Sequence, residues 1–283
     1  MPSETGLKPA ITIEQQIELL ESRGLVIDQK DKANLFLKDN NYYRLNVYFH
    51  KLMDNQNHFI PETNFSKVIK IYETDCYLRK QIFSMLEPIE IKLKTKIAYH
   101  IGCKYGSSAF YQKGIYKSAR RCDQILQSFL KEISWEVKNP VISHHYERYS
   151  GYFPIWVIVE FLSFHNISKY YENLQTKDQK IIALEGFGIN ERLLISWFHS
   201  LSVMRNICAH FGYLYKREYA VPIKFGRDYA IYENKENTLF GIFYCIKHLS
   251  NINQWTYFFD DVCDIVGKET LIRDYFFPED FLV

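Results

Sequence analysis

Apolar residues recur along this chain at the spacing of helices almost from end to end, and runs that alternate like strands are scarce. Gly, Pro and short polar clusters separate the apolar stretches. The pattern therefore predicts a helical protein. The expected helices cover roughly residues 12–24, 28–39, 64–104, 118–138, 154–174 and 190–212, with short helices after 176 and further helices near 238–254, 258–266 and 268–276.

Local signals mark several of these helices and the segments between them. Thr12 and Gln15 have the spacing of a capping box. Pro88 is expected to kink or break the long helix, and Pro154 suits the first position of a very apolar helix. Aromatic residues 41–45 are expected to lead through a polar loop to residue 61. Residues 144–146 and 213–234 also have the composition of loops.

The chain shows no internal repeat, low-complexity tract or flexible linker. Its 283 residues suffice for one large domain or a domain with an appendage. We predict an all-α fold packed as one compact body. It would have a smaller N-terminal helical portion, residues 1–60, and a larger helical domain, residues 61–283.

The helix over 190–212 is the most informative element. Asn190 is a good N-cap, and Gly212 is typical of the position that ends a helix. Most of the helix surface is apolar, so the helix is expected to lie in the core, where polar groups need partners or a chemical role. A narrow polar stripe interrupts the apolar surface; it consists of His199, Ser202, Asn206 and His210, with Arg205 at its edge.

Composition excludes several classes of protein. The aromatic content of 17% is high and favours a bulky helical core over a base-stacking surface. A net charge of +2 is too small to indicate nucleic-acid binding, so any basic surface must be local. The six cysteines are scattered without CxxC or zinc spacing, and neither a signal peptide nor a membrane span is recognisable. We expect a reduced, cytoplasmic protein without metal or cofactor.

An arginine followed a few residues later by histidine marks one class of RNA-cleaving helical domain, but the spacing alone is weak evidence. By chance, about one match is expected in a chain of this composition, and three occur. Arg205 with His210 has the best context, because Asn206 and His210 lie on one helix face. The alternative is a network of hydrogen bonds that serves only to satisfy buried polar groups. The other matches are Arg44 with His50 and Arg192 with His199.

Four segments in order make the chain resemble the Abi (abortive infection) proteins of the AbiD/AbiF type, within the HEPN superfamily of helical ribonucleases. The resemblance spans roughly residues 15–217. This family usually has glycine where His165 stands, and often a second basic or imidazole residue where Phe211 and Gly212 follow the motif. The four segments are 24–28 with 42–45, 77–79 with 87–91, 154–156 with 160–164, and 205–210.

The resemblance implies a HEPN-type helical bundle and metal-independent cleavage of RNA that leaves a 2′,3′-cyclic phosphate. In that reading His210 transfers protons, Arg205 holds the phosphate, and Asn206 orients His210 or donates to a phosphate oxygen. One helix supplies one such histidine, whereas the reaction profits from an acid and a base. The enzymes of this superfamily generally dimerise, so we expect a symmetric homodimer.

Further residues are candidates for supporting roles. Glu160 interrupts an apolar run and is expected to point into the core, either paired with Arg205 or in a structural hydrogen bond. Lys216 and Arg217 lie just beyond the motif, where they are placed to meet RNA phosphates. A basic run is either an RNA-guiding surface or a solvated helix face; it includes Arg79, Lys92, Lys94 and Lys96.

Two functions remain open from sequence. The first is an endoribonuclease and toxin of anti-phage defence that cuts single-stranded RNA, restrained by an antitoxin or a non-coding RNA until infection. The second is a module with the same fold that binds RNA or a partner protein without cleaving it. Intact Arg205 and His210 favour the enzyme, although both groups also suit phosphate binding.

Overall fold

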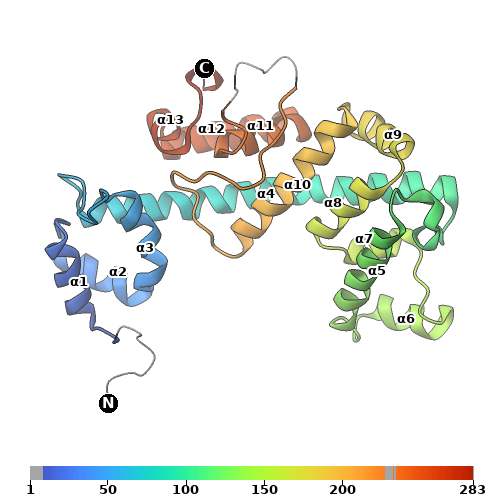
Figure 1. Cartoon of the computed structure of the whole chain (residues 1–283), viewed down its shortest axis with the longest axis horizontal. Coiled ribbons are helices and arrows are strands. Elements are labelled where there is room, and N and C mark those ends of the chain that lie inside the picture. Colours follow the sequence, from blue (N-terminus) through green and yellow to red (C-terminus); the bar gives the residue numbers. More distant parts are fainter. Residues whose placement is uncertain (1–8, 227–231, 233, 283) are drawn as a thin grey trace. The chain divides into compact units, whose positions relative to one another are not determined.

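The computed structural model describes residues 9–226, 232 and 234–282. These residues form helices and no strand, which confirms the predicted all-α helical bundle (Figure 1). The α-helices are α1 (Ile13–Ser22), α2 (Lys30–Asp39), α3 (Tyr42–Lys51), α4 (Phe65–Tyr105), α5 (Ala119–Ser134), α6 (Pro140–Tyr149), α7 (Ile155–Phe161), α8 (Phe164–Asn173), α9 (Thr176–Phe187), α10 (Glu191–Ala209), α11 (Leu239–Leu249), α12 (Ile252–Val266) and α13 (Lys268–Tyr275).

Contacts divide the chain into two compact units. The first comprises Met1–Leu78 with Tyr213–Lys216, and the second comprises Arg79–Gly212 with Arg217–Val283. The division falls within α4 rather than at residue 60, because the first fourteen residues of that helix, Phe65–Leu78, pack with α1, α2 and α3.

The first unit has a small aromatic core. The ring of Phe49 on α3 lies edge-on to that of Phe59, 5.9 Å away. The buried carboxylate of Asp75 accepts hydrogen bonds from the Tyr48 hydroxyl at 2.9 Å and from the backbone amides of Leu214 and Tyr215 at 2.6 and 3.2 Å. These bonds connect the segment 213–216 to α4 although it is distant in sequence.

In the second unit the core is built around α10. Phe198 is fully buried and contacts aromatic rings of two neighbouring helices, Tyr171 of α8 at 6.1 Å and Phe187 of α9 at 5.3 Å. The indole of Trp197 meets Tyr244 of α11 edge-on at 5.6 Å and donates to the carbonyl of Lys224 at 2.7 Å. The abundant aromatic residues thus serve mainly as core, as the composition indicated.

Two predictions about local structure were wrong. Residues 42–51 form α3 rather than a loop, because the Asn41 side chain caps the helix by accepting from the Tyr43 amide. Residues 140–149 form α6, which Asn139 caps in the same way, so His144 and His145 lie on a helix. Helix α4 continues through Pro88 without a break.

The predicted apolar helix over 154–174 is in fact two helices, α7 and α8. Leu162 is extended, and the Ser163 hydroxyl accepts from the Asn166 amide to cap α8. Pro154 precedes α7 as its N-cap instead of occupying its first turn. The chain therefore changes direction where apolar periodicity alone predicts a continuous helix.

The described part of the segment 213–234 is irregular, as expected, whereas 227–231 and 233 lie outside the described residues. Within the described part of the chain, every helix is too short or too polar to span a membrane. Among the same residues no cluster of His, Cys, Asp and Glu has an arrangement that would hold a metal ion.

Candidate functional site

The last turn of α10 carries the polar residues that the sequence singled out. The helix begins as predicted, with the Asn190 side chain accepting from the Arg192 amide at 2.9 Å. One apolar face, which includes Leu194, Leu201 and Met204, is fully buried. This packed face fixes the position of the final turn.

The end of α10 differs from the prediction. His210 is the C-cap, and Phe211 adopts the left-handed conformation, with φ 58°, that was expected of Gly212. The amide of Gly212 donates to the Ile207 carbonyl at 2.7 Å, and that of Phe211 to Cys208 at 3.2 Å, which is a Schellman motif. Gly212 is needed for space, since a Cβ there would lie 2.9 Å from Cγ2 of Ile207.

Arg79 of α4 forms a hydrogen bond to this turn. Its guanidinium donates to the Gly212 carbonyl at 3.1 Å, and its side chain is only 5% exposed. The inclusion of Arg79 in an RNA-guiding surface was therefore wrong. A buried guanidinium bound to a backbone carbonyl positions the turn after His210.

The guanidinium of Arg205 lies over the ring of Phe83 on α4, 5.6 Å from its centroid. Its Nη1 reaches the Oδ1 of Asn206 at 3.5 Å, the limit of a hydrogen bond. Among the described residues Arg205 forms no ion pair with a carboxylate. The ring orients the cation and leaves its charge available to an anion.

Asn206 and His210 are exposed at the same end of the helix. The backbone amide of His210 donates to the Asn206 carbonyl at 2.9 Å, and the imidazole has no hydrogen-bond partner within the described part of the chain. The last turn thus presents a cation, an amide and an imidazole to solvent. Together they have the chemistry to bind a phosphate and exchange a proton with it.

Ser202 and His199 do not join this group. Ser202 is fully buried, and its hydroxyl donates to the His199 carbonyl at 2.8 Å, which gives it a structural role. His199 lies eleven residues, or about three turns, before His210. Its ring faces His165 of α8, with centroids 6.4 Å apart.

His165 lines a second polar hollow, of about 300 Å³, and His199 contacts the His165 ring without lining the hollow itself. Burial and the nearby charge of Lys169 lower the pKa of both histidines. Lys169 pairs with Glu172 at 3.0 Å, and Arg121 of α5 lies 3.9 Å from the same carboxylate. In the sequence, His165 stood out only because the family that the chain resembles usually has glycine there, so this pair was missed.

The expectation that Glu160 points into the core was wrong. Its side chain is exposed on the last turn of α7, and it forms no ion pair with Arg205. Lys94 donates instead to the backbone carbonyl of Glu160, at 3.2 Å. The interruption of the apolar run marks the solvent face of a short helix.

The basic residues proposed to guide RNA have their own packing partners. Lys92 lies over the Phe187 ring at 4.8 Å, and the stem of Lys96 packs against Gly186. Buried Lys94 pairs with Glu90 at 2.9 Å. After the motif, Lys216 lies over the Tyr215 ring at 5.3 Å, and Arg217 over the Tyr219 ring at 5.6 Å.

Sequence reasoning also missed Phe83. Its ring lies four residues after Arg79 on α4, so both side chains share one helix face toward the end of α10. An aromatic residue on a helix of mixed apolar and charged residues carries no sign of such a partner, because the contact joins residues 122 positions apart.

The model of the family described as Abi-like protein matches residues 35–216, which include α10, its final turn and the long helix α4. No curated protein and no solved structure matched the chain.

Proposed function

The chain belongs to the Abi-like protein family, and on that premise we propose that it is a metal-independent endoribonuclease of the HEPN type. Membership of the family points to a role in abortive-infection defence. The observation that carries the proposal is the last turn of α10. There Arg205, Asn206 and His210 meet solvent together at the end of a helix whose apolar face is buried.

The proposed reaction uses a nucleophile that RNA itself contains. A ribose 2′-oxygen attacks the adjacent phosphorus while an imidazole removes its proton. The bond from phosphorus to the 5′-oxygen breaks, and that oxygen takes up a proton. The products are a 2′,3′-cyclic phosphate and a 5′-hydroxyl. His210 would serve as proton carrier, since a histidine side chain exchanges protons near neutral pH.

Arg205 and Asn206 would act on the phosphate. The guanidinium presents two N–H groups to the non-bridging oxygens and offsets the charge that grows in the transition state. Its orientation over Phe83 limits the side-chain freedom that binding would otherwise remove. The amide of Asn206 would donate to a phosphate oxygen or hold Arg205 in place.

The proposal includes a second copy of the chain. One turn of α10 supplies one imidazole, whereas the reaction needs a base at the 2′-oxygen and an acid at the 5′-oxygen. A symmetric dimer that brings two such turns to one phosphodiester supplies both. An antitoxin or RNA that covers this surface would restrain the enzyme.

The test is cleavage of labelled single-stranded RNA by the purified protein in the presence of a chelator. We expect cleavage by the wild type and loss of at least a hundredfold in Arg205→Ala and His210→Ala, since acid–base and charge stabilisation each contribute about that much. Arg192→Ala and His50→Ala are matched controls, because they belong to the other two arginine–histidine spacings and are exposed.

A different result would favour the non-cleaving alternative. If the wild type retains RNA without cutting it, and Arg205→Ala weakens that retention, the same turn is a phosphate-binding surface rather than a catalytic one. If the two control variants lose as much activity as the two site variants, the assignment to the end of α10 is wrong.

A further inference from the structure

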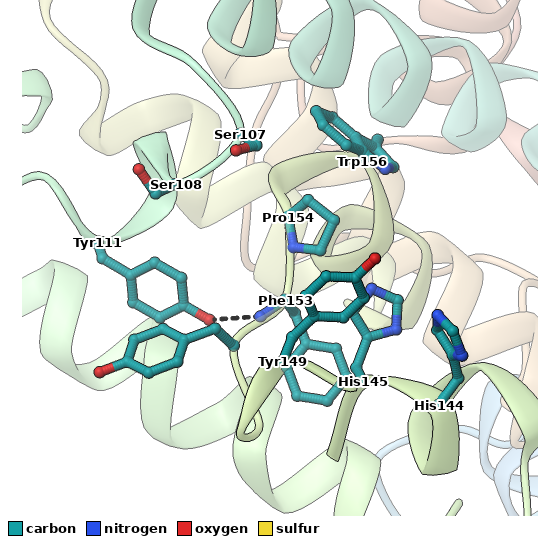
Figure 2. Close-up of a pocket in the computed structure, with 10 residues that line it drawn as sticks. Ser107, Ser108, Tyr111, His144, His145, Tyr149, Phe153, Pro154 and Trp156 are labelled. Carbon is teal, nitrogen blue, oxygen red and sulfur yellow. Dashed lines mark hydrogen bonds between the residues drawn. The ribbon is translucent and has the colours of Figure 1, made fainter. Parts of the chain in front are cut away.

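A separate cavity in the second unit has the properties of a ligand site. It lies between the loop after α4, helix α6 and the start of α7, and its volume is about 380 Å³ (Figure 2). That volume lies within the range of cavities that hold small organic molecules, about 300–1,000 Å³. Neither Arg205 nor His210 lines it.

Aromatic side chains form its walls and lie open to solvent. Tyr149 is 56% exposed, Tyr152 is 66% exposed and Trp156 is 52% exposed. These exposures are high for large rings, which normally bury most of their surface. Several of their faces therefore have no protein partner and remain free to stack on a flat ligand.

The rings are held in place despite their exposure. Trp156 rests against α4, where a Cβ at Gly102 would lie 3.8 Å from its Cε3. Tyr152 meets Tyr111 edge-on at 5.6 Å, and Tyr149 lies 5.3 Å from the ring of His145. A ligand that enters finds surfaces already positioned, which lowers the entropy cost of binding.

The floor of the cavity has a defined hydrogen-bonding state. His145 is only 8% exposed and stacks on Phe153 at 5.1 Å. Its Nδ1 lies 2.8 Å from the Val141 carbonyl, which only accepts, so Nδ1 carries the proton. In the neutral ring Nε2 is then an acceptor.

Tyr111 supplies the complementary donor. Its hydroxyl oxygen accepts from the Phe153 amide at 3.1 Å (Figure 2), which leaves its own hydrogen to be donated. Burial raises the pKa of Tyr111, so the hydroxyl stays protonated. The hydroxyls of Ser107 and Ser108 at the rim have no hydrogen-bond partner among the described residues.

Charge limits the chemistry of the occupant. None of the residues that line the cavity is Lys, Arg, Asp or Glu. The lining offers no opposite charge to an ionic group, so it favours an uncharged part of a ligand. Stacking faces together with separate neutral donors and acceptors suit a planar nitrogen heterocycle.

We propose that this cavity binds a nucleobase, stacked against Trp156 and Tyr149 with its edge toward Tyr111 and His145. Unpaired bases of RNA are commonly recognised by stacking on Tyr, Trp and His. This inference rests on the proposed function, because the base would come from an unpaired nucleotide of the RNA substrate. A free nucleotide presents the same chemistry, and the experiment distinguishes the two.

The test measures binding separately from cleavage. A fluorescent single-stranded oligonucleotide of 2′-O-methyl RNA lacks the attacking hydroxyl and stays intact, and an abasic oligonucleotide of equal length and charge is its control. We expect the base-bearing probe to bind more tightly than the abasic one. Trp156→Ala and Tyr149→Ala should each weaken binding of the base-bearing probe about fivefold or more.

Matched variants distinguish the loss of a stacking surface from the loss of the fold. Trp156→Phe retains a stacking face and should bind within about twofold of the wild type. Trp135→Ala removes an indole that is 74% exposed and lies outside the cavity, and should change nothing. Thermal unfolding followed by circular dichroism should show that all four variants keep the helical fold and a cooperative transition.

Adenosine and uridine, observed by saturation-transfer NMR, form the second arm. Saturation transfer to the base protons of a nucleoside, lost in Trp156→Ala, identifies free nucleosides as ligands. Binding of the oligonucleotide without transfer to either nucleoside identifies RNA as the ligand. Equal affinity of the base-bearing and abasic probes, with no transfer to either nucleoside, overturns the proposal, as does wild-type affinity in Trp156→Ala. Arg205→Ala should lose cleavage and bind both probes more weakly while it keeps the preference for the base-bearing probe, so failure of the nuclease and failure of the cavity are distinguishable.

Discussion

The guanidinium of Arg205 lies over the ring of Phe83, 5.6 Å from its centroid. Arg205 is half-buried on the last turn of α10, and Phe83 lies on the long helix α4. The contact sets the direction of the arginine without neutralising it, as a carboxylate partner would. An arginine held in this way is suited to receive a phosphate.

The first prediction concerns that contact. Phe83→Ala should reduce RNA affinity by about two- to fivefold, because a partly exposed cation–π contact contributes about 0.5–1 kcal/mol. Phe83→Tyr retains the ring face and should bind RNA as the wild type does. Fluorescence anisotropy with uncleavable RNA measures both. Equal affinities for Phe83→Ala and wild type would show that the ring does not position Arg205.

Gly212 provides a test of the turn that follows His210. Gly212→Ala places a Cβ 2.9 Å from Cγ2 of Ile207 and should lower the free energy of unfolding by about 1–3 kcal/mol. Gly114→Ala is the matched control, because nothing lies within 4 Å of a Cβ there and its φ is not positive. Urea unfolding measures the difference between them. Equal stability of the two variants would contradict the close packing of this turn.

Arg79 should matter for the same turn through a different interaction. Arg79→Ala leaves the Gly212 carbonyl without its guanidinium donor, and we expect a loss of about 1–3 kcal/mol in the free energy of unfolding. Lys80→Ala, at an exposed neighbouring position, serves as the control. A stability of Arg79→Ala equal to that of the control would show that the bond contributes nothing.

The histidine pair predicts how stability depends on pH. Burial and the charge of Lys169 lower the pKa values of His165 and His199 below their usual 6.5 in the folded state. Between the lowered pKa values of the folded state and the usual 6.5 of the unfolded state, the unfolded chain therefore binds more protons. The stability from these histidines is complete above about pH 6.5 and declines as the pH falls below it. His165→Gln combined with His199→Gln should flatten this decline.

Urea unfolding at a series of pH values between about 7.5 and 5 checks this prediction, since that range stays above the pKa values of ordinary carboxylates. His248 also has a pKa lowered by burial and by Lys247, so the double variant should retain a smaller decline. A slope unchanged from the wild type would show that the two rings are not responsible.

Features that depend on neighbours in sequence followed from the pattern. Thr12 and Gln15 form the capping box, with bonds of 3.3 and 2.9 Å, and Asn190 begins α10 as expected. The burial of Leu194 and Leu201 followed from helical periodicity. These interactions lie within one or two turns, so the sequence contains all that is needed to predict them.

Features that depend on contacts between distant segments did not follow. Glu160 was expected to be buried but is exposed. A single carboxylate in an apolar run fits a buried helix and a short helix with one solvent face equally well, so the sequence does not distinguish them. The contacts of Phe83 with Arg205 and of Arg79 with Gly212 could not be predicted without knowing how α4 packs on α10. The cavity beside α6 was not predicted, because the polar segment that contains His145 was expected to be a loop.

The central claim is that Arg205 and His210 from two copies of the chain act on one phosphodiester. The most direct measurement follows RNA cleavage over a range of protein concentrations, with the RNA ends identified by mass spectrometry and the oligomeric state measured in parallel. We predict 2′,3′-cyclic phosphate ends and a rate per chain that rises with the fraction of dimer. Ends that carry a 3′-hydroxyl, or full activity in a protein that stays monomeric, would contradict it.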